Sequence, residues 1–168
     1  MWFDEFKTPV GRLVVAADEP GIRRVLFEKN RYEAERDTWR RDPAALREAR
    51  EQILAYFAGE RRAFDLPLDP IGTPFQLRVW NALRQIPFGA TWSYRDVARR
   101  LGDPKAVRAV GAANGRNPLP IIVPCHRVIG SDGRMVGFGG GLPTKQFLLV
   151  HEGLGSVINA SAPAPAGR

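Results

Sequence analysis

The feature that most constrains the fold of this chain is a proline-rich connection between two stretches of different character. Pro67, Pro70 and Pro74 lie close together in FDLPLDPIGTP, where neither a helix nor a central strand can continue. Before this connection the apolar residues come in short runs separated by turn signals, and after it they recur at helical spacing. The chain therefore divides into two parts, which we place at residues 1–70 and 71–153.

The first part contains three short runs that are typical of strands. They are WFDEFK, RLVVAA and IRRVLFEK, and the turns TPVG and DEPG separate them. Two turns between three such runs predict an antiparallel meander. The charged stretch 29–42 is typical of a surface loop. A helix should follow from Pro43 to Gly59, with an apolar face formed by Leu46, Ile53, Leu54 and Phe57.

Two capping signals start helices in the second part. One is Thr73 with Gln76 and the other is Ser93 with Asp96, and each pair can exchange hydrogen bonds across the first helical turn. A further helix over KAVRAVGAANG should follow YRDVARRL after the breakers GDP. Two helices joined by a short turn are typical of a DNA-binding helix-turn-helix. We therefore expect an α+β chain: a small antiparallel sheet with a helix, then a helical, winged helix-turn-helix domain.

The charge of the chain is distributed unevenly. Residues 1–70 hold 13 Lys and Arg against 14 Asp and Glu, and residues 71–168 hold 12 against four, so their net charges are −1 and +8. This asymmetry favours a polyanion partner for the second part, with nucleic acid first, although a merely basic surface is the alternative. No apolar run reaches the roughly 20 residues that span a bilayer, and the N-terminus lacks the pattern of a signal peptide. We expect a cytoplasmic protein that does not bind membranes.

The last helix of the predicted helix-turn-helix is rich in small residues, which include two glycines. A glycine inside a helix costs about 1 kcal/mol relative to alanine, so something should compensate. One explanation is close packing on another element of the protein, and the other is close approach to a groove of DNA. Arg108, which projects from an otherwise small-residue helix, favours the second. The small residues are Ala106, Ala109, Gly111, Ala112, Ala113 and Gly115.

The stretch PCHR holds the single cysteine of the chain, Cys125, followed by His126, one of two histidines. One thiol can form neither an internal disulfide nor a thiolate-rich zinc site, so we expect a free thiol. A lone cysteine is commonly a small buried apolar residue. However, His126 and Arg127 favour a reactive thiolate, on which His126 would act through a water molecule or a shared hydrogen-bond network. Among the few acids of the second part, Glu152 in LLVHEG is the best candidate to orient the imidazole.

A glycine-rich stretch, GRMVGFGGG, covers residues 133–141. It lacks the Lys-Ser/Thr ending of a phosphate-binding loop and the spacing of a dinucleotide-binding loop. Its glycines allow a backbone to approach a ligand closely, and Phe138 could stack on a flat ligand. A plain flexible loop is the alternative.

These motifs together resemble closely the O6-alkylguanine-DNA alkyltransferases, also called methylated-DNA–protein-cysteine methyltransferases. The resemblance runs from about Gly72 to Gly153 and covers FQLRVWNALRQIPFGATWSY, RAVGAANGRNP, PCHRV, GFGGGL and LLVHEG. It implies an RNase H-like first part and a single-turnover DNA repair enzyme without a cofactor. Such a protein flips O6-alkylguanine, or O4-alkylthymine, out of double-stranded DNA through the minor groove and takes the alkyl group onto Cys125. We expect a monomer, with cooperative binding along DNA left open.

The resemblance also implies roles for residues of the site. Cys125 would be the nucleophile, His126 the base that acts through a water, and Glu152 the group that orients the imidazole. Asn117 would stabilise the turn that presents the thiol, and Tyr94 would donate a hydrogen bond to guanine N3.

Further residues follow from the same resemblance. Arg108 would fill the space of the flipped base, and the other expected DNA contacts are Ser93, Ala109, Ala112, Ala113, Asn114, Gly115 and Arg127. Phe138 stands where many relatives have tyrosine, and Gly139 stands where some have serine. The substrate pocket would be formed by Tyr94, Pro120, Val128, Phe138 and Gly139.

The residues alone leave two other functions open. A winged-helix regulator would bind DNA without transferring a group to Cys125, and a Cys-His hydrolase would turn over an acyl substrate without DNA. Some relatives bind zinc in their first part, but residues 1–70 contain neither Cys nor His, so we expect no metal. Alkyltransferase-like proteins carry tryptophan in place of the cysteine, and Cys125 excludes that class. The tail, residues 154–168, is rich in Ala, Pro, Ser and Gly and should be disordered.

Overall fold

The computed structural model describes residues 1–28, 36–133, 138 and 140–156. The chain forms two compact units. The first contains Met1–Ile71 together with Pro118–Ile122, and the second contains Gly72–Asn117 and the described residues from Val123 onward. No pattern in the sequence indicates that residues 118–122 belong to the first unit. The tail prediction lies outside the described residues from position 157 onward.

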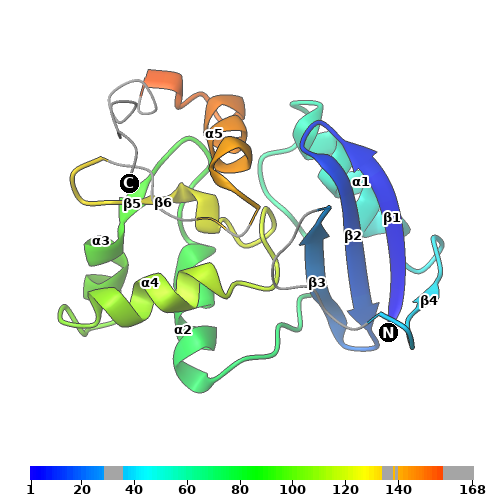
Figure 1. Cartoon of the computed structure of the whole chain (residues 1–168), viewed down its shortest axis with the longest axis horizontal. Coiled ribbons are helices and arrows are strands. Elements are labelled where there is room, and N and C mark those ends of the chain that lie inside the picture. The colour runs from blue at the N-terminus through cyan, green and yellow to red at the C-terminus, as the bar shows by residue number, and fades with distance from the viewer. Residues whose placement is uncertain (29–35, 134–137, 139, 157–168) are drawn as a thin grey trace. The chain divides into compact units, whose positions relative to one another are not determined.

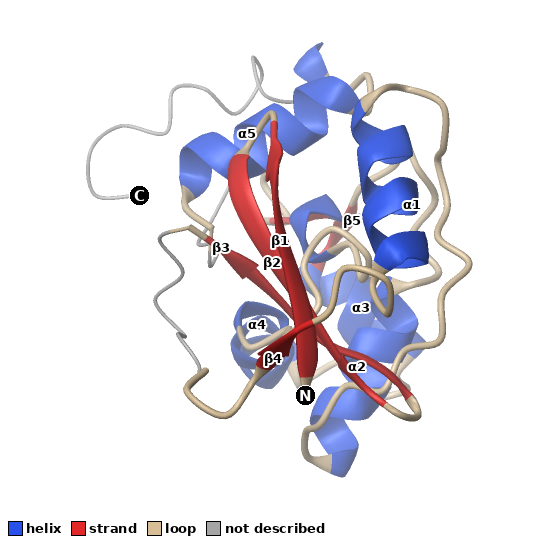
Figure 2. Ribbon diagram, turned by 90° about the vertical axis from the view of Figure 1, so that its right-hand side faces the viewer, coloured by secondary structure: helices blue, strands red, loops and turns tan. Residues whose placement is uncertain are grey.

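The first unit is built on the antiparallel meander that the sequence predicts. Its three strands are β1 (Trp2–Thr8), β2 (Gly11–Asp18) and β3 (Gly21–Phe27), and with the short β4 (Arg40–Arg41) they form a sheet in the spatial order β3-β2-β1-β4. Figure 2 shows β1 and β2 as a long twisted hairpin. The strand β4 (Arg40–Arg41) pairs in parallel with β1, so the predicted loop over 29–42 is wrong at these two residues. Backbone hydrogen bonds account for the pairing, since the Arg40 N–H donates to the Met1 carbonyl. The sequence does not reveal this strand, because two arginines show no apolar pattern. The rest of that loop, from 29 to 35, lies outside the described residues.

The helix of this unit, α1 (Arg47–Phe57), begins later than the predicted start at Pro43. The reason is local: the carboxylate of Asp42 accepts a hydrogen bond from the Ala45 N–H at 3.1 Å and holds the chain in a turn before the helix. The helix ends where the sequence predicts, because Gly59 follows it with φ +79°, a conformation that favours glycine.

One face of α1 packs on β1, and both contribute to the core of the unit. Leu46 and Ile53 are buried as predicted, whereas Leu54 is 38% exposed. Asp4 of β1 is buried at 2% exposure and accepts a hydrogen bond from Arg50 of α1 at 2.5 Å. The unit is therefore a sheet with one helix fixed to it by apolar packing and a buried ion pair.

The second unit is mainly helical, as Figure 1 shows. Its helices α2 (Pro74–Leu83), α3 (Tyr94–Arg100) and α4 (Val107–Gly115) pack on one another, and α3 and α4 form the helix-turn-helix. The short strands β5 (Trp92–Ser93) and β6 (Val128–Ile129) pair in parallel, and β5 contacts α3. This is the α+β architecture that the sequence predicts, with a helical second domain. The unit also contains the one-turn helix η1 (Cys125–Arg127) and the helix α5 (Leu142–His151).

Both predicted capping boxes are present in this unit. The Thr73 hydroxyl accepts from the Gln76 N–H at 3.1 Å, and the Gln76 side chain accepts from the Thr73 N–H at 3.0 Å. The same exchange links Ser93 and Asp96 at 2.8 and 3.0 Å. These local signals fix where α2 and α3 begin, and through β5 and α3 they set the position of Tyr94.

The small residues of α4 divide between two faces of the helix. Ala113 is 3% exposed, and its carbonyl accepts from the Trp80 indole at 2.8 Å. Ala109 and Ala112 are exposed. A Cβ atom on Gly111 would lie 3.8 Å from the Tyr94 ring, an ordinary van der Waals distance. Close packing on the protein therefore explains only the inner face, and the small exposed residues need another reason.

This geometry predicts opposite effects for two alanine substitutions. Gly111→Ala should raise the free energy of unfolding by up to about 1 kcal/mol, because the helical backbone accepts a side chain and the space is available. Gly102→Ala is the matched control, since no atom lies within 4 Å of its Cβ position but φ is +78°. It should lower the free energy of unfolding by about 1 kcal/mol. Urea unfolding measures both, and shifts of the same sign would contradict the prediction.

The segment Pro118–Ile122 joins the first unit through the Pro118 carbonyl, which accepts from the Val25 N–H at 2.8 Å. Ile121 has φ +76°, a left-handed conformation that is rare for a β-branched residue and costs about 1–3 kcal/mol. Ile121 is 1% exposed, so burial offsets that cost. Among the described residues, no helix has the length and apolar character needed to cross a membrane.

Candidate active site

The single thiol of the chain lies in a tight turn set by the preceding proline. Pro124 has φ −80° and ψ 65°, and the Cys125 N–H donates to the Val123 carbonyl at 2.8 Å, which is an inverse γ-turn. The proline ring restricts φ to this range, so the sequence Val-Pro-Cys favours the turn. Cys125 then begins the one-turn helix η1 and is 4% exposed.

Asn117 joins the two points at which the chain leaves and re-enters the second unit. Its side-chain NH2 donates to the Val123 carbonyl at 2.8 Å, across the excursion of residues 118–122. It also forms a hydrogen bond with the Cys125 thiol. Through these two hydrogen bonds Asn117 holds the turn that carries the thiol.

His126 is fully buried, and its Nε2 lies 2.8 Å from Oε2 of Glu152. Burial lowers the pKa of His126, against the opposing effect of Glu152, so the imidazole is neutral near neutral pH. A carboxylate only accepts, so Nε2 carries the hydrogen and Nδ1 is left as an acceptor. Nδ1 is buried and has no hydrogen-bond partner among the described residues. It is therefore available to take a proton.

The carboxylate of Glu152, which follows α5, is held by two residues of η1. Besides His126, the guanidinium of Arg127 donates to it twice, at 2.7 and 3.0 Å. Burial alone would raise the pKa of Glu152, but the hydrogen bonds from His126 and Arg127 bring it down to about 2. A third donor of Arg127 reaches the Ile86 carbonyl at 2.7 Å. Arg127 was expected at the DNA contact, but at 6% exposure its guanidinium lies inside the unit.

Lys145 is the residue of this site that the sequence reasoning missed. It is 0% exposed, and its Nζ donates to the Val128 carbonyl at 2.7 Å. Burial lowers its pKa to about 8, against the opposing effect of the Cys125 charge. A signal was available, because Lys145 precedes Leu148 and Leu149 by three and four residues on the apolar face of one helix.

Burial raises the pKa of the Cys125 thiol. Three groups oppose that rise: the hydrogen bond from the Asn117 side chain, the positive charge of Lys145, and backbone N–H groups of η1. Formation of the thiolate therefore depends on neighbouring groups. The base, His126, and the cation, Lys145, both lie in the second unit.

Tyr94, the first residue of α3, is half-buried beside the thiol. Burial, followed by the nearby Cys125 charge, raises the pKa of Tyr94 to about 12, and a hydrogen bond from the Asn114 side chain opposes this. The phenol stays protonated, so it can act as a neutral donor.

Some of the residues that the sequence predicts to contact DNA lie on the exposed face of α4. Arg108, Ala109 and Ala112 are exposed there, and Gly115 is partly exposed. Ala113 and Asn114, also expected at this contact, lie inside the unit at 3% and 4% exposure, because α4 packs on α2 and α3. The Ser93 hydroxyl is engaged in capping α3.

The expected substrate-pocket residues are only partly brought together. Val128 is fully buried directly after η1, and Phe138 is half-buried. Gly139 lies outside the described residues. Pro120 is buried within the segment that belongs to the first unit.

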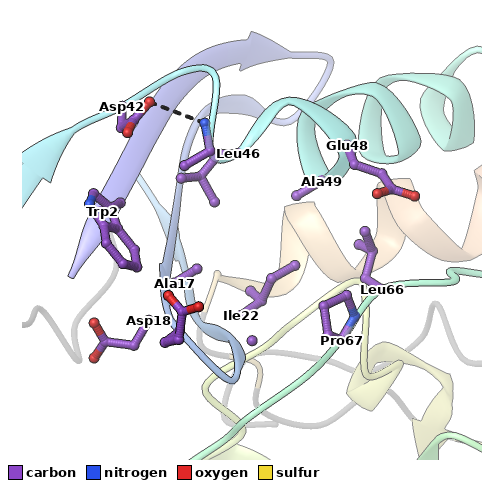
Figure 3. A pocket seen from close by; sticks show the side chains of 13 residues that line it. Trp2, Ala17, Asp18, Ile22, Asp42, Leu46, Glu48, Ala49, Leu66 and Pro67 are labelled. Atoms are coloured by element: carbon purple, nitrogen blue, oxygen red, sulfur yellow. Dashed lines mark hydrogen bonds between the residues drawn. The ribbon is translucent and has the colours of Figure 1, made fainter.

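The first unit holds a cavity of about 400 Å³ of different character (Figure 3). Trp2, Ile22, Leu46 and Leu66 contribute apolar surface, and the side chains of Asp18 and Asp42 lie around it with Glu19 and Glu48. Its described lining contains no Cys, His, Lys or Arg. It therefore offers no thiol or imidazole, and its carboxylates would repel a polyanion. Among the described residues no three His, Cys, Asp or Glu lie together as a metal site would require.

The site in the second unit can carry out nucleophilic substitution. It combines a thiol, a neutral imidazole with a free nitrogen, a carboxylate that fixes the imidazole, and donors from a phenol and an ammonium group. Such a set supplies an attacking sulfur, a proton acceptor and stabilisation for a negatively charged leaving group. The exposed arginine on a small-residue helix nearby in the same unit suits a nucleic acid.

Both units match models of known protein domains. Residues 74–154 match the model of the 6-O-methylguanine DNA methyltransferase DNA-binding domain, and residues 3–70 match that of the family's ribonuclease-like domain. The chain is 49% identical over 154 residues to a methylated-DNA–protein-cysteine methyltransferase of Methanosarcina acetivorans, covering 91% of this chain and 99% of the relative. It is 46% identical to the constitutive enzyme of that name from Bacillus subtilis, covering 88% and 93%.

Solved structures give the same likeness. The crystal structure of Mycobacterium tuberculosis OGT in complex with DNA matches with a TM-score of 0.87 and 45% identity, covering 96% of this chain and 97% of that one. The structure of the M. tuberculosis O6-methylguanine methyltransferase matches with a TM-score of 0.84 and 44% identity, covering 98% and 94%.

Proposed function

The chain belongs to the 6-O-methylguanine DNA methyltransferase family, and from this premise we propose that it repairs DNA by moving an alkyl group from O6 of guanine onto Cys125. Its enzyme class is that of the methylated-DNA–protein-cysteine S-methyltransferases. The observation that carries the proposal is the buried His126, the residue after Cys125: Glu152 holds its Nε2, and its Nδ1 has no hydrogen-bond partner among the described residues.

The proposed reaction is a nucleophilic substitution at the alkyl carbon. The proton of Cys125 passes through a water molecule to Nδ1 of His126, and the thiolate attacks the carbon bound to O6. A carbon–sulfur bond forms while the carbon–oxygen bond breaks, and the electron pair stays on the purine. Tyr94 donates a hydrogen bond to guanine N3 as this charge develops. The purine then takes back the proton from His126, which leaves guanine and a thioether.

We propose that each chain reacts once. A thioether has no leaving group that would regenerate the thiol, and Cys125 is the only cysteine of the sequence. The protein would therefore be consumed in proportion to the lesions that it repairs. The same attack applies to O4-alkylthymine, which also carries its alkyl group on an exocyclic oxygen.

Duplex DNA would lie against the exposed face of α4, with the alkylated base flipped into the site. A base must leave the stack because its O6 substituent is otherwise out of reach of a side chain. The small exposed Ala109 and Ala112 allow the helix to approach the minor groove closely, and Arg108 would fill the space of the flipped base. The net charge of +8 over residues 71–168 supports this part as the DNA-binding one. In this proposal the protein acts as a monomer.

The decisive experiment is mass spectrometry of the protein after incubation with a duplex that contains O6-methylguanine. We expect one methyl group per chain, located on the peptide with Cys125, and none in the Cys125→Ser variant. Binding of the duplex with no adduct on Cys125 would support the winged-helix regulator instead. Repeated turnover of an acyl substrate without DNA would support a hydrolase.

Arg108→Ala should separate base flipping from chemistry. We expect the rate of methyl transfer from duplex DNA to fall by about tenfold, whereas the rate with free O6-alkylguanine base stays unchanged. Arg84→Ala is the control, because it removes the same charge from an exposed position of the second unit outside α4. Equal losses with duplex and free base would contradict the role of Arg108.

A further inference from the structure

Asn114 is a buried amide on α4, the same helix that carries Arg108 on its exposed face. It is 4% exposed, and its Nδ2 lies 3.5 Å from the Cys125 carbonyl oxygen. Its side chain also forms a hydrogen bond with the Tyr94 side chain. One residue of the helix thus contacts both the turn of the nucleophile and the phenol of the site.

The chemistry of these partners fixes the orientation of the amide. A carbonyl oxygen only accepts, so the NH2 end of Asn114 must face Cys125. The NH2 group has two hydrogens, one for the Cys125 carbonyl and one for the Tyr94 oxygen. The opposite orientation would place Oδ1 against the Cys125 oxygen, where two acceptors repel. Oδ1 is instead buried, without a hydrogen-bond partner among the described residues.

This orientation has a consequence for Tyr94. A phenol oxygen that accepts from Asn114 must turn its own hydrogen away from the amide. Without Asn114, the hydroxyl could rotate or accept from other donors. If the hydroxyl hydrogen already points toward the bound base, the hydroxyl does not have to rotate when negative charge develops on the purine.

We propose that Asn114 is a positioning residue that does not contact DNA. Its side chain orients the hydroxyl hydrogen of Tyr94 toward the bound base and links α4 to the turn that carries Cys125. This inference rests on the proposed function. It replaces the expectation that Asn114 touches DNA, because a side chain this deeply buried is not available to a duplex.

The test is single-turnover methyl transfer from an O6-methylguanine duplex, measured over a range of duplex concentrations. This separates the dissociation constant for DNA from the transfer rate constant at saturation. Asn114→Leu removes the amide at similar size, and Asn114→Asp keeps the shape but turns the Tyr94 hydroxyl toward a carboxylate. Each should lower the transfer rate constant by about tenfold or more, with the dissociation constant within about twofold of the wild type.

A double-mutant cycle with Tyr94→Phe separates this role from a merely structural one, because it measures whether the effect of Asn114→Leu on transfer depends on the Tyr94 hydroxyl. If Asn114 acts through the Tyr94 hydroxyl, Asn114→Leu should change transfer by less than about threefold once that hydroxyl is gone. If Asn114→Leu does not fold, Asn114→Asp takes its place in the cycle.

The outcomes that overturn the inference differ from those that overturn the proposed function. The inference alone would be overturned if the Asn114 variants lowered the transfer rate constant equally with tyrosine and with phenylalanine at position 94. It would also be overturned if they weakened DNA binding and left transfer unchanged. Failure of the wild-type protein to acquire a methyl group would instead overturn the proposed function.

Discussion

Replacing Glu152 with glutamine should slow methyl transfer to Cys125 by about a hundredfold or more and lower the free energy of unfolding by about 3–5 kcal/mol. Both effects come from one buried carboxylate that accepts from His126 and twice from Arg127. Glutamine has one acceptor oxygen in place of two, and its NH2 group would face donors. The charge of Arg127 would be left buried without a counter-charge.

The effect on transfer follows from the tautomer of His126. Glu152 keeps the hydrogen on Nε2, which leaves Nδ1 as the base. With glutamine, the imidazole can keep its hydrogen on either nitrogen, and the developing imidazolium has no negative partner. The thiol then loses both a correctly oriented base and its electrostatic support.

The pH dependence of stability gives a second test of the same carboxylate. Its pKa is about 2 in the folded protein against an ordinary value of 4.5, so the folded state favours the charged form. The stability from this group is present above about pH 4.5 and is lost as pH falls toward about 2. The Glu152→Gln variant should lack this part of the acid dependence.

Asp103→Asn is the control, because it changes an exposed acid of the same unit to an amide. It should leave transfer and stability near wild-type values. Wild-type transfer in Glu152→Gln would contradict the role of the carboxylate, even if the protein were destabilised.

The sequence predicted those features whose causes are local. The capping boxes at Thr73 and Ser93, the breakers after α3 and the turns of the meander each depend on residues within a few positions of one another. The late start of α1 was missed because Asp42 holds a turn that competes with the helix signal of Pro43. The strand β4 was missed because two arginines show no apolar pattern and pair only through backbone groups.

In the site, the sequence identified residue types better than their contacts. The motif around Cys125 led to His126, and the scarcity of acids in the second part led to Glu152. The structure brings their side chains to 2.8 Å. Whether a charged residue lies inside or outside depends on tertiary packing, so Arg127 was expected at DNA although it binds Glu152 inside the unit. Lys145 was missed for the same reason. A lysine is rarely buried unless paired, and only its position on the apolar face of α5 signals the exception.

Replacing Lys145 with methionine should lower the rate of methyl transfer near neutral pH by about tenfold or more and move the rate–pH profile to higher pH. The ammonium group favours the thiolate of Cys125, whose pKa burial raises. Without that charge the pKa of the thiol rises further, and each unit lowers the thiolate fraction by about tenfold.

The pH range of this effect follows from Lys145 itself. Its pKa is about 8, so the side chain is mostly charged below that pH and loses its charge above it. The difference in rate between wild type and Lys145→Met should therefore be largest below about pH 8 and should narrow as pH rises through that value.

Stability should separate this role from a structural one. Methionine removes a costly buried charge but also the donor to the Val128 carbonyl, and these two effects oppose each other. The melting temperature should thus change little while transfer falls. Lys105→Met is the control, since this exposed lysine lies in the same unit, and its loss should weaken DNA binding without moving the rate–pH profile. If the profile of Lys145→Met coincides with that of the wild type, the thiolate does not depend on Lys145, and Asn117 and the η1 backbone must stabilise it instead.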